Sequence, residues 1–347
     1  MASGADQGQP LALSPTAGNV LTQLTVTRTP SLPSPTSTIT CTPTPTITRT
    51  PTPSPVPTAT ATPQPPPPTP TPRQPVLKVT KMGVGVYSSG GGHLIDMLFR
   101  TKPTIILLMD PDPALAIEIR RWFPKSFIVG RRYFPQQPLD NPELRGEQAA
   151  DYVAALAVPL KGVVNAWMSY NEPVGTGDYE AYELYNTFQV AFARKLQGTY
   201  GIDAVASNDA IGVVSPDDYP KYFAQAIQES KYFGIHAYPP QKAGSMKEEA
   251  DWYVLRYRRI YQALENAGIE HGPFIITESG LWAGFPGYTT EQRFADDLIW
   301  FTNELEKDPY VLGHAIYGIF ATGHADNTDI SRYPALMDRI GEYMPSK

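Results

Sequence analysis

Cysteine is almost absent from this chain of 347 residues, because Cys41 is the only one. A single cysteine cannot form an intramolecular disulfide, and the chain beyond it cannot supply a cysteine-ligated metal site. These absences exclude a disulfide framework, and they leave no thiol pair for redox chemistry in the remainder of the protein.

Acidic residues are also missing from a long N-terminal stretch, since no aspartate or glutamate occurs between Asp6 and Asp96. Prolines crowd into the same stretch: 19 of the 37 precede Val76, many of them alternating with threonine. Few side chains there can offset the entropy lost on ordering, so we expect residues 1–75 to form a disordered, Pro/Thr-rich stalk or linker. Residues 76–347 then form one domain, whose length of about 270 residues suits a large buried core.

The chain has no block of basic residues and no long apolar run. Its net charge is −6, which argues against nucleic acid or anionic membranes as partners and favours a neutral substrate. No stretch reaches the roughly 18 apolar residues of a membrane span, and no export signal follows Met1. Because Thr/Pro stalks are typical of surface proteins, we expect an extracellular or cell-surface location, with tethering through the stalk and the export signal or anchor outside this sequence.

From residue 82 onward, short apolar runs rich in β-branched residues alternate with longer amphipathic stretches. The amphipathic stretches begin with polar residues and repeat apolar ones at helical spacing. Eight such strand–helix units predict an α/β fold with a parallel sheet closed into a (β/α)₈ TIM barrel. The predicted strands are 82–87, 104–109, 127–132, 163–167, 203–207, 232–237, 274–277 and 314–320, and the clearest predicted helices are 180–196, 219–230, 248–266 and 291–305.

Two isolated glutamates follow predicted strands. Glu172 stands in Asn-Glu-Pro after the fourth strand, and Glu278 stands in Thr-Glu-Ser-Gly after the seventh. They are 106 residues apart, which corresponds to three strand–helix units of about 35 residues. Strands four and seven lie nearly opposite each other across the mouth of a barrel, where barrel enzymes hold their chemistry. We therefore expect both carboxyl groups to face one bound substrate.

These two motifs at this spacing resemble glycoside hydrolase clan A, and the resemblance covers the whole predicted barrel. It implies that Glu172 is the acid/base, that Glu278 is the nucleophile and that Asn171 contacts the sugar 2-hydroxyl. A retaining glycosidase needs this pair: one carboxylic acid protonates the leaving oxygen, and a carboxylate about 5–5.5 Å away attacks the anomeric carbon. The expected activity is hydrolysis of β-glycosidic bonds in a polysaccharide or glycoside, without metal or cofactor, by a monomer.

Further residues are candidates for substrate contact. His236 and Tyr238 end the sixth strand on the same side of it, where the resemblance implies a partner for the nucleophile. Trp282 could stack on a sugar face or pack a lid. Only one of Arg131 and Arg132 can point inward to orient Glu278, and Arg132 is our choice. The other candidates are Asn208, after the fifth strand; Tyr87 and Asp110, which end the first two strands and could equally be packing residues; and Phe320, in place of the tryptophan that many clan A enzymes carry on strand eight.

Two other functions compete with this one. A catalytically inactive carbohydrate-binding surface protein on the same barrel would make the stalk the important part, although the pair of glutamates argues against it. A metal-dependent hydrolase of other substrates would need clustered histidines and aspartates at strand ends. The five histidines show no such spacing in the sequence, so we expect no metal site.

Overall fold

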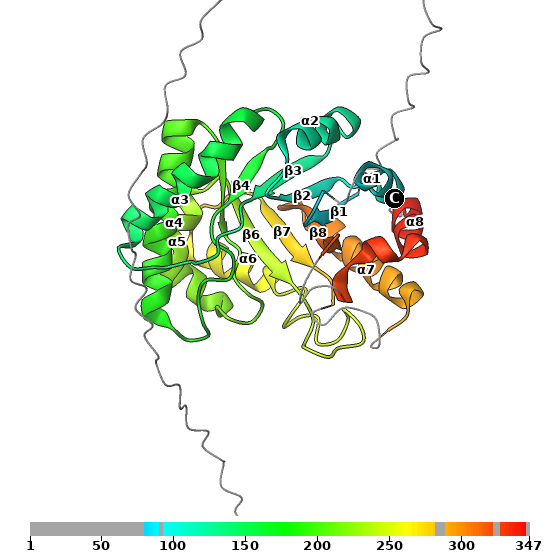
Figure 1. Ribbon diagram of the computed structural model, residues 1–347. Coiled ribbons are helices and arrows are strands. Elements are labelled where there is room, and N and C mark those ends of the chain that lie inside the picture. Colours follow the sequence, from blue (N-terminus) through cyan, green and yellow to red (C-terminus); the bar gives the residue numbers. More distant parts are fainter. Residues whose placement is uncertain (1–79, 90–92, 282–288, 322–326, 345–347) are drawn as a thin grey trace, which may run out of the picture. The chain divides into compact units, whose positions relative to one another are not determined.

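The computed structural model describes residues 80–89, 93–281, 289–321 and 327–344. Within these ranges, parallel strands β1 to β8 pair in sequence order and close into a barrel with β8 beside β1, which confirms the predicted fold class (Figure 1). The predicted stalk at 1–75 lies outside the described residues, so that part of the domain division stays a prediction.

Strands and helices alternate along the chain. The strands are β1 (Met82–Val86), β2 (Ile105–Met109), β3 (Phe127–Arg131), β4 (Ala166–Met168), β5 (Asp203–Ser207), β6 (Tyr232–Ala237), β7 (Phe274–Ser279) and β8 (Val311–Ile319). The helices are α1 (Leu94–Thr101), α2 (Pro113–Trp122), α3 (Pro142–Ala157), α4 (Tyr179–Tyr200), α5 (Ala224–Glu229), α6 (Tyr257–Ala267), α7 (Glu291–Glu306) and α8 (Pro334–Glu342). In Figure 1, α3, α4 and α5 cover one side of the barrel and α1, α7 and α8 the other.

Alternating residues of each strand form two separate apolar layers. On β2, Ile105 and Leu107 belong to a small cluster built from strand residues, which is the interior of the barrel. Ile106 and Leu108 belong to a much larger cluster that includes helix residues, which is the layer between sheet and helices. A side chain at the end of a strand therefore points into the mouth or under the helices according to its place in this alternation.

Local signals set several helix ends. The carboxylate of Asp112 accepts a hydrogen bond from the backbone N–H of Leu115, and Pro113 occupies the first helical position of α2. Asp178 caps α4 in the same way, and Gly201 ends that helix in the left-handed conformation. These caps direct the loops that follow β2 and β4 toward the mouth.

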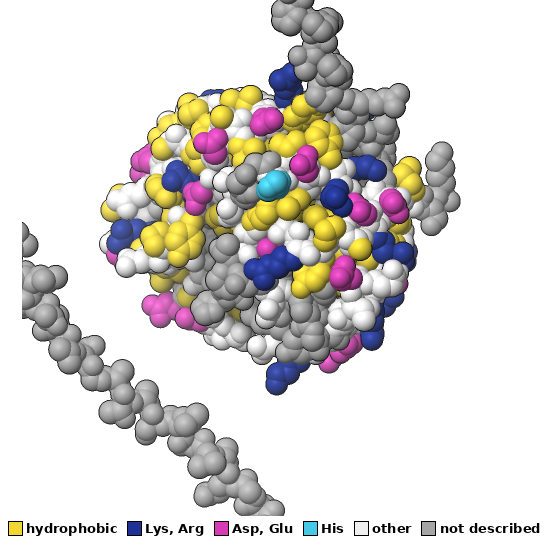
Figure 2. All heavy atoms as spheres, turned by 45° about the vertical axis from the view of Figure 1, so that its right-hand side comes forward, with side chains coloured by type: hydrophobic (Ala, Val, Ile, Leu, Met, Phe, Trp, Pro, Cys, Tyr) yellow, Lys and Arg dark blue, Asp and Glu magenta, His cyan; other side chains and the backbone are white. Residues whose placement is uncertain are grey.

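The surface in Figure 2 carries acidic and basic side chains interspersed, in keeping with the absence of a basic block from the sequence. None of the helices in the described ranges is both long enough and apolar enough to cross a membrane.

Candidate active site

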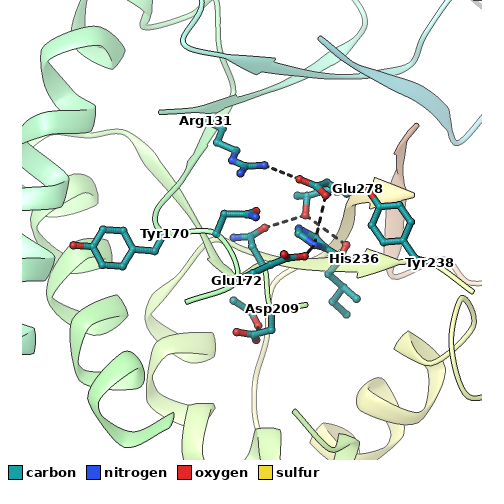
Figure 3. Close-up of polar contacts among 12 residues, drawn as sticks. Arg131, Tyr170, Glu172, Asp209, His236, Tyr238 and Glu278 are labelled. Carbon is teal, nitrogen blue, oxygen red and sulfur yellow. Dashed lines mark hydrogen bonds and ion pairs between the residues drawn. The ribbon is translucent and has the colours of Figure 1, made fainter. Parts of the chain in front are cut away.

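Glu172 and Glu278 meet at the mouth of the barrel, where β4 and β7 end (Figure 3). Glu172 lies four residues beyond the end of β4. Glu278 lies inside β7 and pairs with His236 of β6 in the strand ladder. The sequence predicted that β7 ends at Thr277; the strand is longer because Ser279 still pairs with Ala237.

The carboxylate of Glu278 is buried and has two close partners. Arg131 Nη1 donates a hydrogen bond to Glu278 Oε1 at 2.6 Å, and the hydroxyl of Tyr238 donates to Oε2 at 3.0 Å. Burial lowers the pKa of the Arg131 guanidinium, but the charge and hydrogen bond of Glu278, together with Tyr87 and Tyr317, outweigh it and leave the pKa raised. Glu278 is therefore held in one orientation by an ion pair and a hydroxyl donor.

His236 bridges the two glutamates. Its Nδ1 lies 2.6 Å from Glu172 Oε1 and 3.7 Å from Glu278 Oε2. Burial lowers the pKa of His236, but the charge of Glu278 together with the hydrogen bond and charge of Glu172 outweighs burial and leaves the pKa raised. For Glu172 the directions are reversed. Burial raises its pKa, but the hydrogen bond and charge of His236 and the charge of Arg131 together leave it lowered. The two groups are hydrogen-bonded at 2.6 Å, so titration of either group depends on the other.

The two glutamates are close together. One ligand atom each from Glu172, His236 and Glu278 lies within 4.8 Å of the others, so a carboxylate oxygen of each glutamate comes within that distance of the other. Retaining glycosidases separate their carboxyl groups by roughly 5–5.5 Å, whereas inverting ones leave about 6.5–9.5 Å for a water. One oxygen–oxygen distance of at most 4.8 Å is shorter than the gap that inverting enzymes leave for a water.

The backbone at Glu172 adopts a left-handed conformation, with φ of 53°. Its N–H donates to the carbonyl of Asn208, and Gln137 binds the preceding residue twice, accepting from Asn171 N–H at 2.6 Å and donating to its carbonyl at 2.9 Å. Non-glycine residues in this region carry strain of about 1–3 kcal/mol and are common at functional sites. These hydrogen bonds hold the strained turn that aims the carboxylate at the mouth.

Three buried polar atoms near the two glutamates have no hydrogen-bond partner within the described residues. They are Asn171 Oδ1, His236 Nε2 and the hydroxyl oxygen of Tyr87. A buried polar atom without a partner is costly, and such atoms in a native protein often bind a ligand. Their unused hydrogen-bonding capacity lies close to the two glutamates.

Arg131, and not Arg132, contacts Glu278, so the expectation that Arg132 points inward to orient it was wrong, while a contact of Arg132 with substrate stays a prediction. Phe127, Val129 and Arg131 alternate into the barrel interior, which sends the next side chain outward. Arg132 instead pairs with Asp110, Nε to Oδ1 at 2.7 Å, and its guanidinium lies over the ring of Tyr152 at 3.9 Å.

Asn208 positions Glu172. Its side chain is fully buried, and its Oδ1 accepts from the hydroxyl of Thr277 at 3.0 Å. Its carbonyl accepts from the N–H of Glu172, and its predicted contact with substrate stays a prediction.

Phe320 packs against the layer outside the barrel, and within the described ranges no ring contact joins it to the site. Tyr317, on β8, lies near Glu278, and its ring centroid is 4.2 Å from that of Tyr87. Burial and the charge of Glu278 raise the pKa of Tyr317 to about 12. The contact of Phe320 with sugar stays a prediction, and Trp282 lies outside the described residues.

Sequence reasoning also missed a buried acid, Asp209. It accepts a hydrogen bond from the hydroxyl of Ser207, and burial raises its pKa to about 6. In Figure 3 it lies below Glu172. Its position directly after Asn208 at the end of β5 was the available signal. Alternation along β3 was the corresponding signal for Arg131.

Glu172, His236 and Glu278 could also hold a metal ion, because two carboxylates and an imidazole converge there. The histidine spacing in the sequence did not reveal this trio, since its members come from three different strands or loops. The trio is poorly suited to a cation, because the guanidinium of Arg131 lies 2.6 Å from Glu278 and its positive charge repels a metal ion bound there.

The fold is similar to that of several solved glycoside hydrolases. A family 39 glycoside hydrolase from Bacteroides cellulosilyticus WH2 matches 76% of this chain and 64% of its own, with 12% identity and a TM-score of 0.53. A glucosidase from Croceicoccus marinus matches 77% and 67%, with 12% identity and a TM-score of 0.52. A GH2 β-galacturonidase from Eisenbergiella tayi matches 74% and 48%, with 14% identity and a TM-score of 0.50.

No protein-family model and no curated protein matches the sequence. At 12–14% identity, the structural matches establish a shared barrel fold. The chain spans 64% of the length of the family 39 hydrolase, so it corresponds to a part of that protein.

Proposed function

We propose that this protein is a retaining β-glycoside hydrolase that acts by double displacement. The observation that carries the proposal is the pair Glu172 and Glu278 at the barrel mouth, with carboxylate oxygens within 4.8 Å and with different partners. The solved structures of similar fold are described as glycoside hydrolases, which supports the same class of reaction.

Glu278 is proposed as the nucleophile. Its partners, Arg131 and Tyr238, stabilise the carboxylate and fix its direction. In the first step, a carboxylate oxygen of Glu278 bonds to the anomeric carbon while the bond from that carbon to the leaving oxygen breaks. The product is a glycosyl ester on Glu278 and an alcohol that needs one proton.

Glu172 is proposed to deliver that proton. The pKa of Glu172 is lowered, so the shared proton resides on the His236 side of their hydrogen bond. The proton reaches Glu172, the group that faces the leaving oxygen, by crossing one hydrogen bond of 2.6 Å. The ester removes the negative charge of Glu278, and Glu172 then accepts a proton from the attacking water, which cleaves the ester with overall retention.

The unpartnered atoms supply substrate contacts in this proposal. Asn171 Oδ1 accepts from a sugar hydroxyl, while the hydroxyl of Tyr87 both donates and accepts. Tyr317 beside Tyr87 presents an aromatic wall to the apolar face of the ring. The substrate is a neutral polysaccharide or glycoside.

Two measurements test the proposal. The purified protein is incubated with β-glucans, mannans, xylans, galactans and aryl β-glycosides, and released reducing sugar is measured; we expect release from at least one of them. NMR of the first-formed anomer should then show the configuration of the substrate. An inverted anomer would remove Glu278 from the nucleophile role.

A metal-dependent hydrolase is the second candidate, favoured by the trio of Glu172, His236 and Glu278. Treatment with EDTA separates the two, because a metal enzyme loses activity on chelation and regains it with Zn²⁺ or Mn²⁺. We expect activity to be unchanged. An inactive sugar-binding protein would bind substrates from the same panel and hydrolyse none.

A further inference from the structure

A buried carboxylate that the proposed mechanism does not use lies at the turn after β5. Asp209 is 3% exposed, and in Figure 3 it lies below Glu172. Its Oδ2 accepts a hydrogen bond from the hydroxyl of Ser207, whereas its Oδ1 is buried and has no hydrogen-bond partner among the described residues. A buried carboxylate oxygen without a partner costs free energy of folding, so its presence here calls for an explanation.

The backbone that presents Asp209 is strained and firmly held. Ser207 and Asn208 both adopt the left-handed region, with φ of 67° and 72°. The side chain of Gln189 accepts from the N–H of Ser207 at 2.7 Å and donates to its carbonyl at 3.1 Å. The hydroxyl of Tyr185 donates to the same carbonyl at 2.7 Å. These hydrogen bonds offset the strain and fix the direction in which the Asp209 side chain leaves the turn.

His236 also has an unused buried atom. Its Nδ1 is bonded to Glu172 Oε1 at 2.6 Å, while its Nε2 has no hydrogen-bond partner in the described ranges. Burial raises the pKa of Asp209 to about 6, against the opposing effects of the Ser207 hydrogen bond and the positive charge of His236. Because the interaction of two charges is mutual, an ionised Asp209 favours the protonated imidazole of His236.

The ionisable groups that interact with Asp209 come from four neighbouring segments: Tyr182 and Tyr185 on α4, Tyr219 in the short helix Tyr219–Phe223, His236 on β6 and Glu172 after β4. The three tyrosines stay neutral near pH 7, because burial raises the pKa of each hydroxyl. Arg256, directly before α6, acts on Tyr219 and keeps its charge throughout. Among these groups, Asp209 and the Glu172–His236 pair are therefore the ones whose charge changes near neutral pH.

Resting on the proposed function, we infer that Asp209 is a positioning residue for proton delivery, whose buried carboxylate acts through His236 to keep the proton on the Glu172–His236 pair. Asp209 itself touches no substrate. At low pH it is protonated and has no effect on the pair. As pH rises it ionises, and its negative charge opposes the loss of the proton that Glu172 delivers to the leaving oxygen. The general acid then remains protonated to a higher pH than the pair alone would allow.

The test compares Asp209→Asn with Asp297→Asn in the full-length protein. Asparagine resembles the protonated carboxyl group but cannot ionise. Asp297 is the matched control, because it is a carboxylate on α7 that is 2% exposed and accepts from the backbone N–H of Met246, outside this cluster. EDTA is present in every assay, so that no metal at the two glutamates contributes.

The value of kcat/KM is measured from pH 4 to pH 9 on two β-glycosides of one sugar. One carries a dinitrophenyl leaving group and the other an alkyl leaving group, and only the alkyl group needs a proton to depart. We expect Asp209→Asn to match the parent on both substrates below about pH 5. The alkaline limb for the alkyl glycoside should move about one pH unit lower, an approximately 10-fold loss on that limb, while the dinitrophenyl glycoside shows no change.

Asp297→Asn should keep the parent profile. Ser207→Ala removes a hydrogen bond that favours ionised Asp209, so it should move the same limb in the same direction, and it decides the question if Asp209→Asn does not fold. A loss that is equal at every pH or equal on both substrates would make the role of Asp209 structural and overturn the inference. An alkaline limb that does not move would overturn it as well.

Titration of His236 by ¹⁵N NMR separates this inference from the proposed function, because it needs no turnover. The midpoint should fall by about one pH unit in Asp209→Asn and stay in place in Asp297→Asn. That shift, with no glycoside hydrolysed by the parent, would keep the coupling of Asp209 to His236 and overturn both the proposed function and the proton-delivery role. Hydrolysis by the parent without the shift would overturn the inference on Asp209 and keep the proposed function.

Discussion

Arg131 contributes the positive charge closest to Glu278, at 2.6 Å. Replacing it by glutamine removes the charged donor that holds the Glu278 carboxylate in place. We expect Arg131→Gln to lower kcat/KM for an aryl monoglycoside on the order of 100-fold, because misplacing a reacting group by about 1 Å costs about that much.

Arg132→Gln is the matched control for that variant, since Arg132 is the adjacent arginine and pairs with Asp110 outside the barrel interior. Its activity on the monoglycoside should equal that of the parent. Equal losses in both variants would show that the effect comes from general destabilisation and not from the contact with Glu278.

The hydrogen-bonded pair of Glu172 and His236 predicts a stability profile with pH. The pKa of Glu172 is lowered in the folded protein. Its contribution to the free energy of unfolding is therefore present above the ordinary carboxyl pKa and is lost as pH falls through the lowered pKa. The pKa of His236 is raised, so its contribution is complete below the ordinary imidazole pKa and is lost as pH rises through the raised value. The pair therefore stabilises the fold fully between about pH 4.5 and 6.5.

Melting temperatures of the parent and of Glu172→Gln, measured from pH 3 to pH 9 in matched buffers, check this profile. The difference should be largest in that window and should decrease on both sides. A difference that does not vary with pH would contradict the ionised pair.

For single residues, the sequence predicts which residues belong to the site better than it predicts where their side chains point. Glu172, Glu278, His236 and Tyr238 were identifiable because each ends or follows an apolar run. The choice between neighbouring arginines depended on the phase of alternation in β3, which is set by the barrel register and not by local composition.

At the level of elements, the ring of Trp167 on β4 packs directly over Gly130, its register partner on β3. A Cβ there would meet the ring of Trp167 at 2.6 Å, a distance that real side chains do not adopt. Gly130→Ala should therefore destabilise the protein by about 1–3 kcal/mol, through overpacking of the sheet–helix layer.

Gly198 in α4 provides the opposite case, because a Cβ there would meet nothing within 4 Å. Gly198→Ala should stabilise the protein by about 0.5–1 kcal/mol, since alanine favours a helix more than glycine does. Urea unfolding of both variants measures the two changes. Equal shifts of the same sign would contradict the packing described for Gly130.

Element boundaries could be predicted only in part, for identifiable reasons. The predicted strand 163–167 is the shorter β4, because the N–H groups of Val163 and Val164 donate to the carbonyl of Leu160 and are not available to the sheet. The predicted helix 248–266 begins only at Tyr257, since Glu249 has a left-handed φ of 47° that interrupts a helix. Periodicity detects amphipathic segments but not a single backbone angle.

At the level of the whole molecule, the barrel itself was predictable. In its eight strand–helix units, the spacing of apolar residues alternates between about two residues in strands and about 3.6 in helices. Parallel pairing of consecutive strands follows from this alternation of strands with helices. The trio of Glu172, His236 and Glu278 was not predictable as a cluster from spacing, because closure of the barrel brings distant segments together.

The composition of residues 1–75 predicts a spacer that contributes nothing to the barrel, and we propose that it tethers the domain at or outside the cell surface. Deletion of residues 1–72 should leave the melting temperature and the turnover number of the barrel unchanged. Differential scanning calorimetry and kinetics on both proteins test this. A clear fall in melting temperature would show that the segment docks on the barrel.

The assignment of Glu278 as nucleophile and Glu172 as acid/base is tested most directly by trapping the ester. In Glu172→Gln, an aryl β-glycoside with a good leaving group should still form the glycosyl ester, because departure then needs little protonation, but the ester should persist without its base. Intact-mass and peptide mass spectrometry should then find one sugar residue attached to Glu278, and none in the double variant Glu172→Gln/Glu278→Gln. The opposite result, an active parent with no adduct or an adduct on another residue, would contradict the proposed mechanism.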